Sequence, residues 1–182
     1  MSKRWMQIGS STAMALLLTG AAPGADEGQS LARGILDKAG VKGGLIVHLG
    51  CGSGRLTAAL RVNEGFLVHG LAADARNVEA ARKHIQTLGL YGPVSVEHWT
   101  GQRLPYADNL VNLLVASDKW PVASEEVMRV LSPRGVALLV NPKSKIQNPK
   151  SVKPWPKEID EWTHYLHDAS NNAVAHDTVV GP

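Results

Sequence analysis

The chain has 182 residues, of which 44% are hydrophobic and 19% charged, a composition typical of a globular domain and unlike that of a disordered chain. Two of its 19 basic residues, Lys3 and Arg4, precede the first acid, so the rest of the chain is nearly neutral and no basic face for nucleic acid is expected. The single cysteine excludes an intrachain disulfide and any multi-cysteine zinc site.

Residues 1–25 have the pattern of an export signal. Lys3 and Arg4 precede a compact apolar run at residues 13–18, and small residues occupy most of 20–25 before Asp26. The alternatives are an uncleaved membrane anchor and an ordinary apolar N-terminal helix. The signal predicts an exported protein, periplasmic or extracellular. No later run is long and apolar enough for the mature chain to span a membrane.

Residues 30–140 alternate helices and strands. Helices are expected at 30–39, 55–62, 75–88 and 124–131, and strands at 44–49, 66–71, 94–98, 110–116 and 136–140. The strands are mostly continuous apolar runs, as in parallel strands that are buried on both faces. This order predicts an α/β fold: a Rossmann-like, doubly wound, mainly parallel sheet of about five strands, followed by an extended C-terminal arm. The strand at 44–49 should lie inside the sheet and run parallel to the one at 110–116.

The chain changes character after residue 140. Residues 141–157 contain four prolines, five lysines and no acid, which predicts a linker and not a continuation of the layered domain. Residues 158–182 form the arm proper. So few residues cannot bury enough apolar surface to fold alone, so the arm should be anchored through Trp155 and Trp162. A short helix is expected at 158–167 and a frayed end beyond Asn171.

A glycine-rich loop, Gly50-Cys51-Gly52-Ser53-Gly54, joins the first strand to the next helix. Glycines at such a junction let the backbone approach a ligand closely, and the helix N-terminus favours a polar group. The loop is neither a dinucleotide fingerprint nor a P-loop, because Arg55 and Thr57 follow it. Ligand binding and a simple tight turn both remain open at this point.

Residues 47–54 resemble the first motif of class I S-adenosylmethionine (SAM) dependent methyltransferases. The resemblance continues in the family's order through residues 68–71, 77–82, 104–106 and 130–135. It implies the family's fold over residues 30–140, SAM as cofactor, and a methyl acceptor that is unknown. The positions that it assigns to the cofactor site are His48, Gly50, Cys51, Gly52, Gly54 and Asp74, the last as a ribose contact; no catalytic residue can be named.

The sequence departs from that family at its acids. His48, Ala72, Thr100 and Asn112 stand where the family usually has acidic residues, Ala72 at the ribose-binding position. A missing charge-assisted hydrogen bond of about 1.5–3 kcal/mol would weaken cofactor binding about ten- to a hundredfold. Two functions therefore stay open. One is a SAM-dependent methyltransferase or its degenerate descendant, and the other is a non-catalytic module.

Residues 153–182 resemble the junction that precedes a pyrroloquinoline-quinone (PQQ) type β-propeller in large exported bacterial proteins. That resemblance implies that a propeller follows in the longer protein and that the arm docks on it. Under the second function, the methyltransferase-like domain would position or shield such a propeller.

Several histidines are candidates for chemistry. His164, His167, Asp168, His176 and Asp177 could ligate a metal, but hydrogen bonding and packing are the favoured interpretation, so no metal site is predicted. Cys51 is expected to be a packing thiol and not a nucleophile, because no base is fixed beside it. His48 and His69, near strand ends, are expected to be structural.

Overall fold

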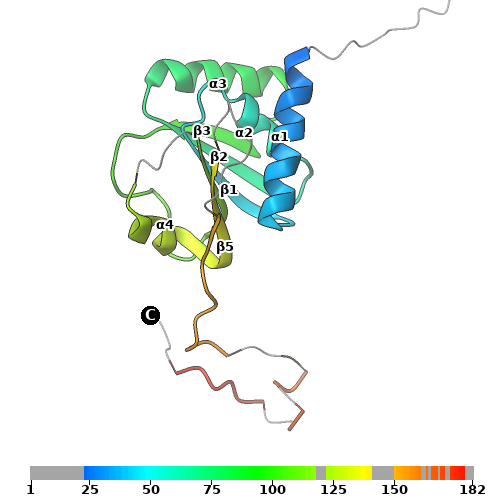
Figure 1. The fold of residues 1–182 in the computed structure, drawn as a ribbon, viewed down its shortest axis with the longest axis vertical. Coiled ribbons are helices and arrows are strands. Elements are labelled where there is room, and N and C mark those ends of the chain that lie inside the picture. The colour runs from blue at the N-terminus through cyan, green and yellow to red at the C-terminus, as the bar shows by residue number, and fades with distance from the viewer. Residues whose placement is uncertain are drawn as a thin grey trace, which may run out of the picture.

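The computed structural model describes residues 23–117, 122–140, 150–160, 163, 165–167, 169–170 and 173–178 (Figure 1). The helices are α1 (Pro23–Ala39), α2 (Arg55–Ala59), α3 (Ala75–Thr87) and α4 (Ser124–Val130). The strands are β1 (Gly44–Leu49), β2 (Phe66–Ala72), β3 (Val94–His98), β4 (Val111–Ser117), β5 (Leu131–Val140) and β6 (Lys150–Val152). Nearly all of the predicted export signal lies outside the described residues.

The strands form one sheet in the order β3-β2-β1-β4-β5-β6. β1 lies in the interior, parallel to β2 on one side and to β4 on the other, with Val47 opposite His69 and Leu114. The first five strands are parallel, and β6 pairs antiparallel with β5. The predicted α/β fold is therefore confirmed, with one strand more than the five expected.

Helices cover both faces of the sheet, with α1 and α4 on opposite sides (Figure 1). Successive side chains of a strand point to opposite faces, so each strand contributes to two cores. Ile46 of β1 packs in the core under α1, α2 and α3, whereas Val47 packs in the core under α4. Because the first five strands are parallel, their carboxyl ends lie at the same end of the sheet, and the loops that follow them meet there.

The segment 141–157 was predicted as a linker outside the sheet, and for residues 150–152 this is wrong. They form β6, with Val152 opposite Val136, and Lys153 extends the pairing by accepting a bond from the Arg134 amide at 2.9 Å. A parallel sheet that ended at β5 would expose a row of unpaired backbone groups, and β6 covers part of it. Residues 141–149 lie outside the described residues.

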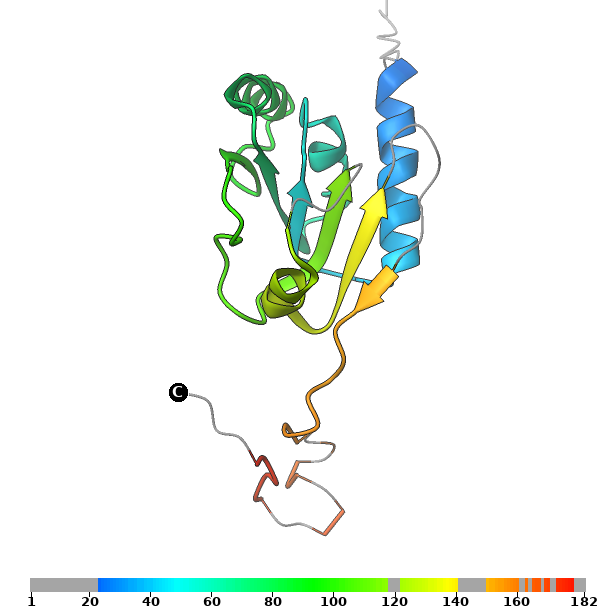
Figure 2. The ribbon, with the colours of Figure 1, turned by 60° about the vertical axis from the view of Figure 1, so that its left-hand side comes forward.

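The arm leaves the sheet at the end opposite the glycine loop, because β6 runs against the other strands (Figure 2). The Trp155 ring lies under the Arg134 guanidinium at 4.7 Å, which confirms an anchor there; Trp162 lies outside the described residues. The predicted helix at 158–167 is wrong for the described residues, which form turns, with His167 in the left-handed region at φ 64°.

The expected fraying beyond Asn171 stays a prediction, and residues 171–172 and 179–182 lie outside the described residues. The Thr178 amide donates to the Glu158 carbonyl at 3.0 Å, so the chain folds back on the start of the arm. None of the helices in the described part of the chain combines the length and hydropathy that a membrane span needs.

Candidate functional site

The glycine loop lies at the carboxyl end of β1, where the strand order changes direction. The chain proceeds from β1 to β2 and β3 on one side, and then returns to β4, β5 and β6 on the other. In open α/β sheets, ligands bind in the crevice at such a switch point. The loop 50–54 is therefore placed where a cofactor site is expected.

Its three glycines have positive φ angles: 75° at Gly50, 50° at Gly52 and 77° at Gly54. The Gly50 and Cys51 amides both donate to the Leu71 carbonyl, at 2.9 and 3.3 Å, which fixes the loop on the end of β2. Such angles are costly for residues that carry a Cβ atom. The loop is thus a backbone structure held by glycine geometry.

The glycines face different surroundings. A Cβ atom at Gly54 would lie 2.8 Å from the Cβ atom of Ala81 on α3, whereas a Cβ atom at Gly52 would meet no atom of the described residues within 4 Å. Gly54 therefore allows α2 and α3 to pack closely. Gly52 presents bare backbone to open space, which is where a ligand could approach.

His48 joins three elements at the base of the loop. Its Nδ1 lies 2.9 Å from the Thr57 hydroxyl of α2, and its Nε2 lies 3.0 Å from the Ser117 hydroxyl of β4. Burial lowers the pKa of His48 to about 4, so the ring is neutral at physiological pH. These bonds support the structural role expected for His48.

Cys51 is buried, and burial raises the pKa of its thiol to about 11. A protonated, inaccessible thiol is a poor nucleophile. This finding supports the packing role expected from the sequence.

The position that the resemblance assigns to ribose binding, Ala72, carries no acid. Ala72 is buried and has no side-chain acceptor, and its carbonyl receives the Trp99 amide at 2.9 Å. Asp74, two residues on, caps α3: its Oδ1 accepts the Arg76 amide at 2.9 Å, and its Oδ2 pairs with the Arg76 guanidinium at 3.0 Å. The hydrogen bonds from Arg76 lower the pKa of Asp74. Its role as a ribose contact stays a prediction.

The other two positions at which the sequence replaces an acid, Thr100 and Asn112, lie at opposite ends of the strands. Thr100 is exposed just beyond β3, on the loop side of the sheet. Asn112 lies at the opposite edge, where its Oδ1 accepts the Leu45 amide at 2.9 Å and occupies the space over Gly44. The Asn112 replacement therefore concerns the pairing of β1 with β4 and takes nothing from the cofactor site.

A polar network that sequence reasoning missed holds the segment after β3. Arg129 donates to the Leu104 and Tyr106 carbonyls at 3.1 and 2.9 Å, and Glu126 accepts the Leu104 amide at 2.6 Å. The hydrogen bond from Arg129 lowers the pKa of Glu126 to about 2. The Tyr106 hydroxyl lies 2.8 Å from Nδ1 of His69, so His69 is a structural partner, as expected.

Of the predicted metal-ligand candidates, the structure brings His167 and His176 together, with Asp160 as an unpredicted third member. Asp177 instead accepts the Asp160 amide. His164 and Asp168 lie outside the described residues. This group is on the arm and is separate from the glycine loop.

Residues 46–135 match the family model described as the methyltransferase domain. No curated protein is similar enough to match the chain. A solved protein of Methanococcus maripaludis, provisionally named an S-adenosyl-L-methionine-dependent methyltransferase, is 22% identical, with a TM-score of 0.58 over 64% of this chain and 56% of that one.

Two further solved structures are similar. The geranyl diphosphate C-methyltransferase of Streptomyces coelicolor A3(2), solved with Mg²⁺, geranyl diphosphate and S-adenosyl-L-homocysteine, is 18% identical, with a TM-score of 0.56 over 62% of this chain and 45% of that one. The [4+2]-cyclase SpnF is 21% identical, with a TM-score of 0.55 over 61% and 43%. The chain thus spans about half the length of these proteins, and it has the class I SAM-dependent methyltransferase fold.

Proposed function

We propose that this chain is a SAM-dependent methyltransferase whose methyl acceptor is unknown, and that the loop 50–54 receives the methionine end of the cofactor. The observation that carries the proposal is the loop itself, at the switch point between β1 and β4, with the backbone of Gly52 facing open space. When bound, SAM supplies a methyl group activated by its sulfonium. The methyltransferase-domain match over residues 46–135 supports the same assignment.

The residues around the loop suit a cationic cofactor. His48 is neutral because of its burial, so it adds no positive charge two residues before the loop. Methyl transfer depends mainly on aligning the acceptor with the methyl group, so few catalytic side chains are needed. The chain's contribution would be to fix the loop through the Leu71 carbonyl and to hold the segment after β3 through Arg129.

The fit is weaker at the ribose end. Ala72 offers no acceptor, and the Asp74 carboxylate already binds Arg76. We therefore expect SAM to bind about ten- to a hundredfold more weakly than in a site that has the acid.

Isothermal titration calorimetry tests this proposal by comparing the SAM affinity of the parent chain with that of the variant Gly52→Ala. Its added methyl group enters the open space beside the loop and should weaken SAM binding at least about tenfold, or about 1.4 kcal/mol. Gly40→Ala is the matched control, because Gly40 also has a positive φ, 73°, and an added Cβ there meets no described atom within 4 Å, but it lies at the end of α1. Gly40→Ala should bind SAM as the parent does. No binding heat with millimolar SAM, or equal weakening by both variants, would contradict the proposal.

A second candidate is a non-catalytic module of an exported protein, favoured by the absent acceptor at Ala72. Since the [4+2]-cyclase SpnF shares the fold, the fold alone does not fix a reaction. Under this candidate SAM would not bind, and the gene beyond Pro182 would encode the β-rich repeats of a propeller. A stop codon at that point would contradict this candidate.

A further inference from the structure

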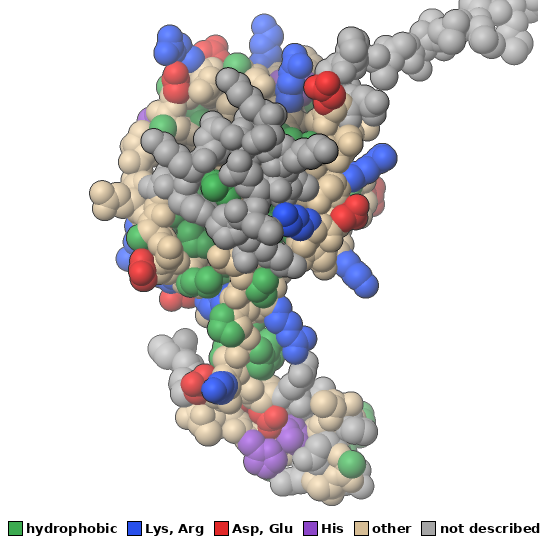
Figure 3. All heavy atoms as spheres, in the orientation of Figure 1, with side chains coloured by type: hydrophobic (Ala, Val, Ile, Leu, Met, Phe, Trp, Pro, Cys, Tyr) green, Lys and Arg blue, Asp and Glu red, His purple; other side chains and the backbone are tan. Residues whose placement is uncertain are grey.

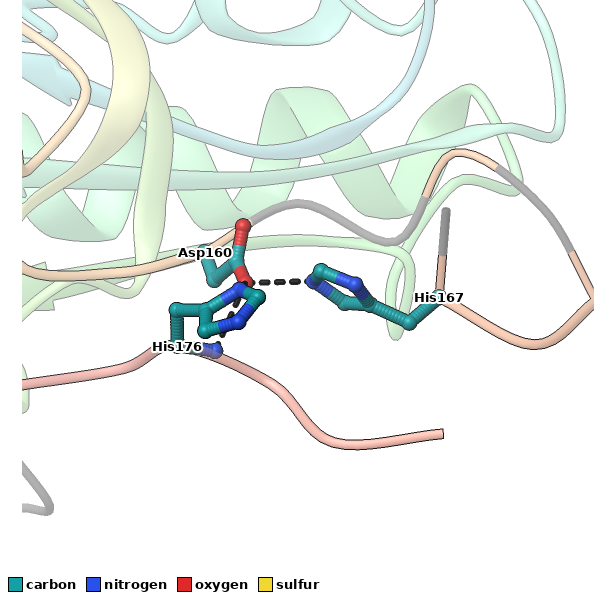
Figure 4. A group of neighbouring side chains, drawn as sticks. All are labelled: Asp160, His167 and His176. Atoms are coloured by element: carbon teal, nitrogen blue, oxygen red, sulfur yellow. Dashed lines mark hydrogen bonds and ion pairs between the residues drawn. The ribbon is translucent and has the colours of Figure 1, made fainter. Parts of the chain in front are cut away.

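The arm contains a compact group of metal-ligand side chains, which we call the arm cluster: Asp160, His167 and His176 (Figure 4). One potential ligand atom from each lies within 4.8 Å of the others. The His167 ring bonds to Oδ2 of Asp160, and Nδ1 of His176 lies 3.3 Å from the same oxygen. Three residues spread over 17 positions of the sequence therefore converge on one point.

One distance in the arm cluster already fits a small transition-metal ion. Zinc bonds to imidazole nitrogen and carboxylate oxygen are about 2.0–2.2 Å long, so neighbouring ligands in a tetrahedron lie about 3.3–3.5 Å apart. The separation of 3.3 Å between His176 Nδ1 and Asp160 Oδ2 already has this value. The His167 ring would exchange its hydrogen bond to Asp160 for a bond to the metal, releasing the shared proton.

The chemistry of the ligand set selects the class of metal. Two imidazoles and one carboxylate suit Zn²⁺, Fe²⁺, Cu²⁺ or Ni²⁺, whereas Mg²⁺ and Ca²⁺ prefer oxygen ligands alone. Three protein ligands leave a further position for water or another group.

The arm needs a source of order that its apolar residues do not supply. Tyr165, Val174 and Ile159 are 94%, 58% and 43% exposed, so little apolar surface is buried among the described residues of the arm. His167 is the exception: it is only 3% exposed although it is polar, and its backbone is in the left-handed region at φ 64°. A segment this short usually needs a metal or a disulfide to become ordered.

Local bonds hold the ligands in position. The Thr163 amide donates to the His167 carbonyl at 2.9 Å, which closes the turn that presents His167. The His176 amide donates to Oδ2 of Asp160 at 2.7 Å, and Asp177 accepts the Asp160 amide. The ligands thus come from three separate stretches of the arm that these bonds hold together.

We propose that Asp160, His167 and His176 bind a divalent transition metal of the Zn²⁺ class, and that the metal fastens the turns of the arm to one another. The site lies at the end of the arm, beyond the edge of the sheet opposite the glycine loop, where histidine and acidic side chains gather (Figure 3). It is therefore independent of SAM binding.

Calorimetry with Zn²⁺ on the untagged, chelator-treated full chain tests the site. We expect saturable binding of one ion per chain, no comparable binding of Mg²⁺, and visible absorption bands when Co²⁺ replaces Zn²⁺. Asp160→Asn, His167→Ala and His176→Ala should each lower Zn²⁺ affinity at least about 100-fold, since even changes behind the ligands cost 10–100-fold. His84→Ala, which removes a histidine from α3, should leave the affinity unchanged.

Hydrogen exchange supplies a second readout. Zn²⁺ should slow exchange at residues 173–178 in the parent chain and have no effect there in His167→Ala. The circular dichroism of the α/β domain should be the same in all variants, because the arm lies outside its core. Absence of saturable Zn²⁺ binding would overturn the proposal, as would binding that survives all three arm substitutions.

Discussion

Gly54→Ala is expected to destabilise the domain strongly, because Gly54, which precedes α2, packs directly against Ala81 of α3. The new Cβ atom would lie 2.8 Å from the Ala81 Cβ atom and 3.0 Å from its Cα atom. Ala81 is completely buried, so it has no free space to move into. Overpacking of this kind costs about 1–3 kcal/mol. The left-handed backbone at φ 77° adds about 1–2 kcal/mol for a residue with a side chain.

The expected loss is therefore about 2–5 kcal/mol in the free energy of unfolding. Gly52→Ala separates the two contributions, because Gly52 also has a left-handed backbone, but its added Cβ meets no atom of the described residues within 4 Å. It should cost only the backbone part, about 1–2 kcal/mol.

Urea unfolding followed by circular dichroism measures both variants and a double variant. Ala81→Gly removes one of the two clashing atoms, at a helix cost of about 1 kcal/mol. In the Gly54→Ala background it should recover part of the loss, giving a coupling energy of about 1 kcal/mol or more. Equal stability of Gly54→Ala and Gly52→Ala, together with zero coupling to Ala81, would refute the packing argument.

The remaining predictions concern two buried groups of the site. His48 has a folded-state pKa of about 4 against an ordinary 6.5, so the unfolded chain binds its proton first and stability falls as the pH drops from 6.5 to 4, by up to about 3 kcal/mol. His48→Gln should lack this pH-dependent component. Urea unfolding at several pH values measures it, and the same pH dependence of the free energy of unfolding in parent and variant would contradict the prediction. Cys51, with a pKa of about 11, should react with Ellman's reagent at pH 8 only after denaturation; rapid labelling of the folded chain would count against its burial.

The sheet could be predicted because its strands are local and regular. Apolar runs such as residues 44–49, each followed by a helical pattern, leave few topologies once crossovers are right-handed. The glycine loop could be placed for the same reason, since a strand and a helix flank it. The predicted helix at 55–62 is longer than the observed α2, because Leu60 caps the end of α2. The chain then turns through Asn63, whose Oδ1 accepts the Gly65 amide at 2.8 Å.

Other features depend on contacts between distant residues, and the sequence could not show them. β6 is only three residues long in a segment rich in proline and lysine, and it forms because β5 offers an open edge. Asp160 has no pattern that links it to His167 and His176, since the turns that unite them are irregular. The bonds of Arg129 to the segment after β3 likewise join residues more than 20 positions apart.

The structure also changes what the glycine motif can be taken to mean. Gly54 allows two helices to pack, Gly50 makes the turn that binds the Leu71 carbonyl, and His48 and Cys51 are buried structural groups. Each of these residues would be needed to fold the domain even if no cofactor bound. Among the described residues of the motif, the open face at Gly52 is the feature that packing does not explain. The presence of the motif is therefore evidence for the fold. Evidence for cofactor binding comes from comparing the SAM affinities of Gly52→Ala and Gly40→Ala.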